Sequence, residues 1–259
     1  MTTSREFRSA FARGARSAAL AFVLATAWLI MPAAAQSDRE RISVIELFTS
    51  QGCSSCPPAD ALLKRYSDRR DVVALTMAVD YWDYLGWKDT LASPKFSARQ
   101  RAYAKARRDG AVYTPQAVVN GTIHVNGSDR AQIDEAIERT SRKSEPAVSL
   151  TCRTENGAMV VEVGNAAPGQ AVKDGTLWLA VVQPQAEIPV KHGENRGRTL
   201  AYYNVVRELT PVGMWSGKAT TVRLPHGAFE TSPGARFAIL LQQESVGPIL
   251  AAAWAPARR

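Results

Sequence analysis

The chain has 259 residues, of which 46 % are hydrophobic and 22 % charged, and its formal net charge is +8 at pH 7. It contains no internal repeat and no low-complexity tract, which excludes repeat architectures and leaves one large domain or two small ones. The basic residues are densest between Lys95 and Arg108, where they read as the solvated face of a helix, so nucleic-acid binding is not expected.

The first 35 residues have the pattern of a secretory signal peptide. Four arginines precede an uncharged apolar run from Ala18 to Met31, and small residues follow it. The run is shorter than the roughly 20 residues that a membrane span needs, and no cysteine follows for lipid attachment. We predict cleavage between Ala35 and Gln36, a periplasmic or secreted protein, and no stable membrane span afterwards. An uncleaved anchor is the alternative.

Residues 36–146 alternate strand-like and helix-like segments. Apolar runs at 42–48 and 72–79 predict buried strands, and Asn120-Gly121 between two short apolar segments predicts a hairpin. Apolar residues at helical spacing predict an amphipathic helix after residue 56, a second helix at 93–108 and a third from Asp129. The predicted order is therefore β-α-β-α-β-β-α.

The sequence Cys53-Ser54-Ser55-Cys56 lies between the first predicted strand and the first predicted helix. Two cysteines three residues apart at a helix start suit thiol–disulfide exchange, because the positive end of the helix dipole favours a thiolate. Pro57 predicts that the helix begins there, with Cys56 near the cap and biased away from helical backbone angles. A structural disulfide and a metal site are the alternatives. The chain has no second CxxC pair to complete a zinc site, so no metal is expected.

An aromatic and acidic segment, Asp80–Asp89, directly follows the second predicted strand. Loops at the carboxyl ends of strands form binding crevices in α/β sheets, so this segment is expected beside the cysteines. We interpret Trp82, Asp83 and Trp87 as a substrate-binding wall. The alternative is a hydrophobic cap over the core.

Residues 147–259 predict a small β-sandwich. Seven short strands are separated by turn residues, at Val148–Cys152, Met159–Val163, Leu177–Gln183, Leu200–Leu209, Thr220–Leu224, Arg236–Gln243 and Leu250–Trp254. The connection at 184–199 is long and polar, which is typical of functional or mobile loops. The third cysteine, Cys152, is expected to be a buried apolar residue.

The first half resembles a thioredoxin domain in its strand, its CxxC at a helix start, and Thr114-Pro115 just before the hairpin. The resemblance implies a cis bond at Pro115, with Thr114 and Pro115 beside the cysteines; an ordinary trans turn is the alternative. It also implies a proton acceptor for the second cysteine at Glu46, for which the alternative is an edge-strand carboxylate that lies in water or pairs with a basic residue. The sequence differs from thioredoxins at Gly52, directly before Cys53, where they have tryptophan. This difference predicts a more open face beside Cys53.

The whole mature chain resembles an exported bacterial family known as domain of unknown function 1223. The similarity is carried by residues 46–60, 79–89, 193–200 and 204–207. The predicted fold is thus a thioredoxin-like α/β domain at 36–146 followed by an all-β domain at 147–259. The family name implies no substrate.

The predicted function is an exported thiol–disulfide oxidoreductase in which Cys53 attacks and Cys56 resolves. Its partners would be protein or small-molecule thiols and disulfides and an unidentified redox partner, without a cofactor. The alternative is a binding module, either one that handles copper through Cys53, Cys56 and His124 or an interaction domain with an inert disulfide.

Overall fold

The computed structural model describes residues 42–142, 148–167, 174–225, 227 and 234–256. The predicted signal peptide lies outside these residues, and so does most of the predicted domain boundary at 141–146. The chain from Glu40 to Arg259 forms one compact unit. None of the helices in the described part is long and apolar enough to cross a membrane.

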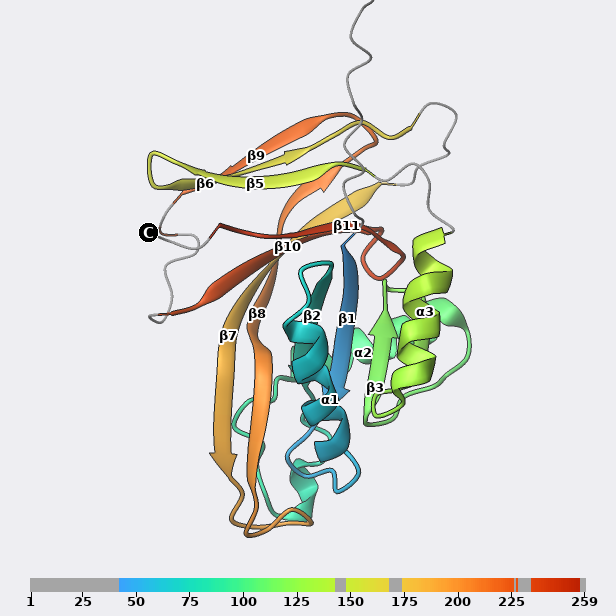
Figure 1. Ribbon diagram of the computed structural model, residues 1–259, viewed down its shortest axis with the longest axis vertical. Helices are drawn as coiled ribbons and strands as arrows, with labels where there is room; N and C mark the ends of the chain where they lie inside the picture. The colour runs from blue at the N-terminus through green and yellow to red at the C-terminus, as the bar shows by residue number, and fades with distance from the viewer. Residues whose placement is uncertain (1–41, 143–147, 168–173, 226, 228–233, 257–259) are drawn as a thin grey trace, which may run out of the picture. The chain divides into compact units, whose positions relative to one another are not determined.

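The central feature is a mixed sheet of eight strands (Figure 1). These strands are β1 (Ser43–Thr49), β2 (Val72–Ala78), β3 (Gln116–Val119), β4 (Ile123–Asn126), β7 (Gly175–Pro189), β8 (Thr199–Trp215), β10 (Arg236–Gln243) and β11 (Ile249–Trp254). Their order across the sheet is β11-β10-β7-β8-β2-β1-β3-β4. Strand β1 pairs parallel with β2 and antiparallel with β3.

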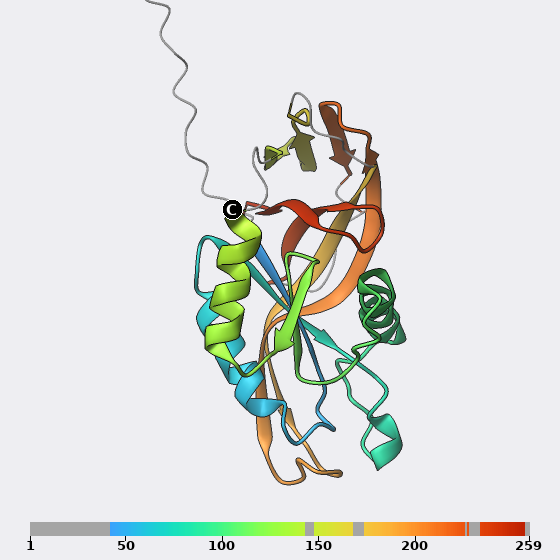
Figure 2. The ribbon, with the colours of Figure 1, turned by 90° about the vertical axis from the view of Figure 1, so that its right-hand side faces the viewer.

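Three α-helices in the described residues cover the two faces of this sheet. They are α1 (Pro57–Ser67), α2 (Pro94–Arg107) and α3 (Arg130–Arg142), and a short 3-10 turn, η1 (Asp83–Leu85), precedes α2. Successive residues of a strand point to opposite faces, so Ile45 and Leu47 of β1 pack with α1 and α3 while Val44 and Phe48 pack with α2. Figure 2 shows α1 and α3 on one side of β1 and α2 on the other.

A second, three-stranded sheet packs against one end of the large sheet. It contains β5 (Leu150–Glu155), β6 (Ala158–Val163) and β9 (Thr220–Leu224), in the order β5-β6-β9. Its inward residues, such as Val161, share a buried cluster with Leu179 and Ile239 of the large sheet. This local packing is sandwich-like, but four of the seven strands predicted for a sandwich belong to the other sheet.

The predicted fold class is therefore wrong, although the strands and helices that it was built from exist. Strand β8 pairs with β2 at Val205 and Thr76, which makes the strands of the second half continue the sheet of the first. The Thr76 hydroxyl donates to the Tyr203 carbonyl at 2.7 Å, and the Asn204 amide donates to the Ala74 carbonyl at 3.0 Å. The chain is a mostly β protein with one mixed sheet running through both halves, not a thioredoxin domain followed by a separate β domain.

Strands β7 and β8 are much longer than predicted and form a hairpin arm that extends beyond β10. They pair from Gly175↔Trp215 as far as Pro189↔Thr199. The long loop predicted at 184–199 is thus shorter than expected, because 184–189 and 199 belong to the strands and residues 190–198, here called the tip loop, connect the two. Tight turns at Gly193 and Gly197, whose φ angles are 78° and 79°, fold the tip loop back on itself. The arm carries this loop to the cysteine turn at the start of α1.

Candidate thiol–disulfide site

Cys53 and Cys56 form a disulfide in the turn between β1 and α1. Backbone bonds from the Cys53 amide to the Ser50 carbonyl and from the Cys56 amide to the Cys53 carbonyl, both 3.2 Å, shape the turn. Helix α1 begins at Pro57 with Cys56 as its N-cap, as predicted. Cys56 nevertheless has helical angles, φ −78° and ψ −36°, so the expected bias from the following proline is overridden.

The helix start offers few amide hydrogens to a thiolate. Pro57 and Pro58 have none, and the Ala59 amide donates to the Cys56 carbonyl at 2.9 Å. The side-chain neighbour of the Cys53 sulfur is the Ser55 hydroxyl, at 3.4 Å. Stabilisation of a Cys53 thiolate would therefore come from this hydroxyl and from the helix dipole.

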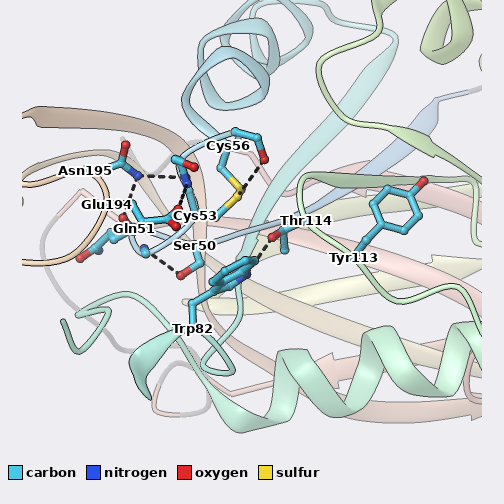
Figure 3. The surroundings of a disulfide bond; sticks show 12 residues. Ser50, Gln51, Cys53, Cys56, Trp82, Tyr113, Thr114, Glu194 and Asn195 are labelled. Atoms are coloured by element: carbon cyan, nitrogen blue, oxygen red, sulfur yellow. Dashed lines mark hydrogen bonds between the residues drawn. A yellow bond between two sulfur atoms is a disulfide. The ribbon is translucent and has the colours of Figure 1, made fainter. Parts of the chain in front are cut away.

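The tip loop binds the backbone of the cysteine turn. Asn195 is fully buried and its amide donates to two backbone carbonyls of the cysteine turn, Gln51 at 3.0 Å and Cys53 at 2.9 Å. Glu194 accepts a hydrogen bond from the Ser54 amide at 3.2 Å. Figure 3 shows both side chains reaching the turn from the arm. In the folded protein Cys53 is only 1 % exposed and Cys56 is fully buried.

Trp82 occupies the face that was expected to be open next to Gly52. A side chain at position 52 would meet the Trp82 Cβ at 2.9 Å, so only glycine leaves room for the indole. The Trp82 ring donates to the Thr114 hydroxyl at 2.8 Å, which ties the aromatic segment to the loop before β3 (Figure 3). The Thr114–Pro115 bond is cis, as the resemblance implied.

The remaining residues of the predicted wall surround the turn at Gln51. The Trp87 ring donates to the Gln51 side chain at 2.8 Å, and Asp89 accepts from the Gln51 amide at 2.7 Å. Asp83 accepts from the Asp89 amide at 3.0 Å, so it holds the segment's own backbone. The structure thus places Trp82 and Trp87 beside the cysteine turn and Asp83 one layer further out.

Glu46 is not brought to the disulfide. It shares the face of β1 that α2 covers, whereas the cysteine helix α1 covers the opposite face. Its carboxylate accepts from the Arg99 guanidinium at 2.7 and 3.1 Å and from the Tyr103 hydroxyl. Both ends of the ion pair are buried, with side-chain exposures of 6 % for Arg99 and 0 % for Glu46.

The acidic residue near Cys56 is Asp60, which the sequence analysis missed. Asp60 lies one helical turn after Cys56, and side chains four residues apart are neighbours about 5–6 Å apart at Cβ that tilt toward the helix start. Asp60 is 3 % exposed, and neither of its carboxyl oxygens has a hydrogen bond of normal geometry. The buried hydroxyls of Thr49 and Tyr202 also lack a hydrogen bond of normal geometry. The sequence signal for this neighbour was the four-residue spacing between Cys56 and Asp60.

Burial raises the pKa of the Asp60 carboxyl to about 8, with the nearby Thr49 hydroxyl opposing the shift and the Asp89 carboxylate adding to it. The group therefore holds its proton at neutral pH. An acid that is neutral inside the fold and titrates near pH 8 is suited to exchanging a proton with a thiol.

This shift predicts a pH effect on stability. Above about pH 5 the unfolded chain has already lost the Asp60 proton, because its pKa there is 3.8, while the folded protein keeps that proton up to about pH 8. Folding therefore takes up a proton in this range, and the Asp60 group lowers the wild-type unfolding free energy as pH rises from 5 to 8. Asp60→Asn removes that loss. The unfolding free energy of Asp60→Asn minus that of wild type should therefore increase by about 2–4 kcal/mol from pH 5 to pH 8. Urea unfolding of the oxidised proteins measures both values. A constant difference across this range would show that Asp60 is ionised in the folded protein.

The other candidate ligands lie elsewhere. His124 on β4 contacts the Tyr113 hydroxyl at 2.9 Å and the Asp109 carboxylate at 3.2 Å with its two ring nitrogens. Figure 3 shows Tyr113 pointing away from the disulfide. Cys152 on β5 is partly buried, and burial raises the pKa of its thiol to about 12. Among the described residues no three His, Cys, Asp or Glu side chains are grouped to hold a metal ion.

Comparison with known proteins places this site in a family. A crystal structure of a protein from Agrobacterium tumefaciens superposes with a TM-score of 0.75 at 32 % sequence identity, covering 85 % of this chain and 96 % of that one. No curated protein was found to match the chain. The family described as "Protein of unknown function (DUF1223)" matches residues 44–242. The chain therefore belongs to this family, as its sequence motifs predicted.

Proposed function

We propose that the protein is a thiol–disulfide oxidoreductase that uses Cys53 and Cys56, and that it works outside the cytoplasm after removal of the predicted signal peptide. The observation that carries the proposal is the disulfide at the start of α1 with the protonated Asp60 one turn behind Cys56. A purely structural cross-link has no use for an acid buried beside it, because burial of a carboxyl group costs free energy of folding.

The proposed reaction has two exchange steps. A substrate thiolate attacks the Cys53 sulfur; a substrate–Cys53 disulfide forms, the Cys53–Cys56 bond breaks, and Cys56 leaves as a thiolate that takes the Asp60 proton. A second substrate thiolate then attacks the mixed disulfide and releases Cys53 as a thiolate. Two substrate thiols are oxidised to a disulfide and the protein disulfide is reduced to two thiols. In the reverse direction the Asp60 carboxylate takes the proton of Cys56, which then attacks the mixed disulfide.

Cys53 is the attacked sulfur in this proposal because of its place in the turn. Cys56 is the helix cap, fixed by the two prolines that follow it, and it faces the interior with Asp60. Cys53 precedes the exposed residues Ser54 and Ser55, and its backbone carbonyl accepts a hydrogen bond from Asn195 of the tip loop. Trp82 and Trp87 flank this turn and form the proposed substrate wall.

The test is a trapping experiment with single-cysteine variants. Cys56→Ser leaves the attacking thiol without its resolving partner, so it should accumulate mixed disulfides with protein or small thiols, seen as a mass increase that a reductant reverses. Cys53→Ser should accumulate at least about tenfold less, because Cys56 is fixed as the helix cap facing the interior whereas Cys53 lies next to the exposed residues Ser54 and Ser55. Cys152→Ser is the matched control and should leave wild-type exchange unchanged. Equal trapping by both variants, or trapping by neither, would reject the assignment.

A further inference from the structure

An open groove lies between helix α1 and the β8 side of the arm, directly behind the cysteine turn. Its volume is about 270 Å³. Pro57 and Arg198 line the end nearest the disulfide, and Lys64 and Tyr203 line the far end. The reaction proposed above uses one residue of the lining, Asp60, and gives no role to the others.

The accessible charges that line the groove are positive. Arg198 comes from the arm and Lys64 from α1, and both are at least partly exposed. Lys64 pairs with Asp68, but Asp68 does not line the groove. The one acid in the lining, Asp60, has both carboxyl oxygens buried and presents no negative charge to a ligand. The groove therefore favours an anionic ligand.

The β8 edge of the groove has unused backbone hydrogen-bonding groups. Strand β8 pairs with β2 only at Val205, so no strand of the described residues pairs with Thr199–Tyr203 on the α1 side. The Tyr203 carbonyl points to that side, where it meets the Thr76 hydroxyl. Ala201, two residues away, presents its amide and carbonyl in the same direction and lines the groove. An amide group of a ligand would find a donor and an acceptor there.

The size of the groove limits the ligand. At 270 Å³ it is just below the range of about 300–1,000 Å³ usual for drug-sized ligands. The edge from Thr199 to Tyr203 is roughly 13 Å long, enough for a chain of a few extended residues. We propose that the groove binds the carboxylate-bearing end of a small peptide thiol, of di- or tripeptide size, and places its sulfur at the Cys53–Cys56 disulfide. The placing of the sulfur rests on the proposed function, but the binding of the anionic peptide does not.

The binding is tested first without redox chemistry. N-acetyl-Ser-Gly, which has no thiol, is titrated into the oxidised protein as the free acid and as its C-terminal amide, followed by calorimetry. We expect saturable binding of the acid, at least about fivefold weaker binding of the amide, and a similar loss for the acid in Lys64→Gln. Lys95→Gln, on the exposed surface of α2, is the matched control and should bind like wild type. Equal affinity for acid and amide, or no effect of Lys64→Gln, would overturn the groove as an anion site.

The second arm measures reduction of the disulfide by N-acetyl-Cys-Gly, again as acid and as amide, at equal thiolate concentration. The acid should react about fivefold faster with wild type, and the ratio should fall to near one in Lys64→Gln. Binding of the serine peptide without any exchange with the cysteine peptide would keep the groove as a site and reject the proposed function. Exchange with no preference for the acid would keep the proposed function and reject the groove as its substrate site.

Discussion

Replacing Glu46 by alanine should lower the free energy of unfolding by about 3–5 kcal/mol, the usual cost of removing one partner of a buried ion pair. The substitution would leave the Arg99 guanidinium buried without its carboxylate. The pair also belongs to a network, because Arg99 donates to the Gln242 side chain at 2.9 Å and Gln242 donates to the Tyr103 hydroxyl at 2.8 Å. Guanidinium unfolding followed by tryptophan fluorescence measures the loss.

The control is Glu162→Ala, which removes a half-exposed partner of Arg153 and should change the unfolding free energy by less than about 1 kcal/mol. Glu46→Gln adds a second readout. If Glu46 only holds the fold, this variant should exchange thiols at the wild-type rate wherever it is folded. A slow exchange in folded Glu46→Gln would restore the proton-acceptor role that the sequence resemblance implied. A loss of less than about 1 kcal/mol in Glu46→Ala would show that the buried pair is not needed for stability.

The Glu46 network also explains why the domain organisation was not predictable. Gln242 lies in β10, within the segment assigned to a separate domain, yet it bonds Arg99 and Tyr103 on α2. Hydrophobic alternation identifies each strand and its buried face, and it found all the strands of the second half. It does not identify the neighbour of a strand, because the pairing of Val205 with Thr76 joins residues far apart in the sequence.

The residues of the candidate site also fall into a predicted group and an unpredicted group. The helix start at Pro57 and the CxxC turn were predicted from local sequence. The placement of Trp82 beside the turn was also predicted. The groups that come from other elements were not. Asn195 lies 142 residues from Cys53 in the sequence, and no pattern in the tip loop predicts its two hydrogen bonds to the cysteine turn. Asp60 had a local signal, its spacing from Cys56, but its burial and its raised pKa come from the folded chain around it and could not be predicted from that spacing.

Because the disulfide is buried, we predict that undocking of the tip loop limits the rate of thiol–disulfide exchange. A thiolate must approach a sulfur atom directly, and Cys53 is 1 % exposed while the tip loop is docked. The docking depends on Asn195, which donates to two carbonyls of the turn and accepts from the Arg198 guanidinium at 2.9 Å. We therefore predict that opening of these bonds exposes Cys53 to an attacking thiolate.

Asn195→Ala should speed reduction of the disulfide by dithiothreitol at least about tenfold. The variant loses two buried hydrogen bonds that each contribute about 0.5–1.5 kcal/mol, and 1.4 kcal/mol corresponds to a factor of ten in the open population. The pseudo-first-order rate is measured by thiol labelling and intact mass on the folded proteins. Arg196→Ala, an exposed residue of the same loop, is the matched control and should reduce at the wild-type rate.

The unfolding free energy of each oxidised variant distinguishes local opening from general loss of stability. Faster reduction of Asn195→Ala should persist when wild type is brought to the same stability with urea. If the two rates then coincide, the disulfide is reached through global unfolding and the tip loop does not control it. If Asn195→Ala reduces as slowly as wild type, some other part of the chain limits access to Cys53. The expected result, a rate increase confined to the variant that frees the tip loop, would make loop opening the first step of the exchange reaction.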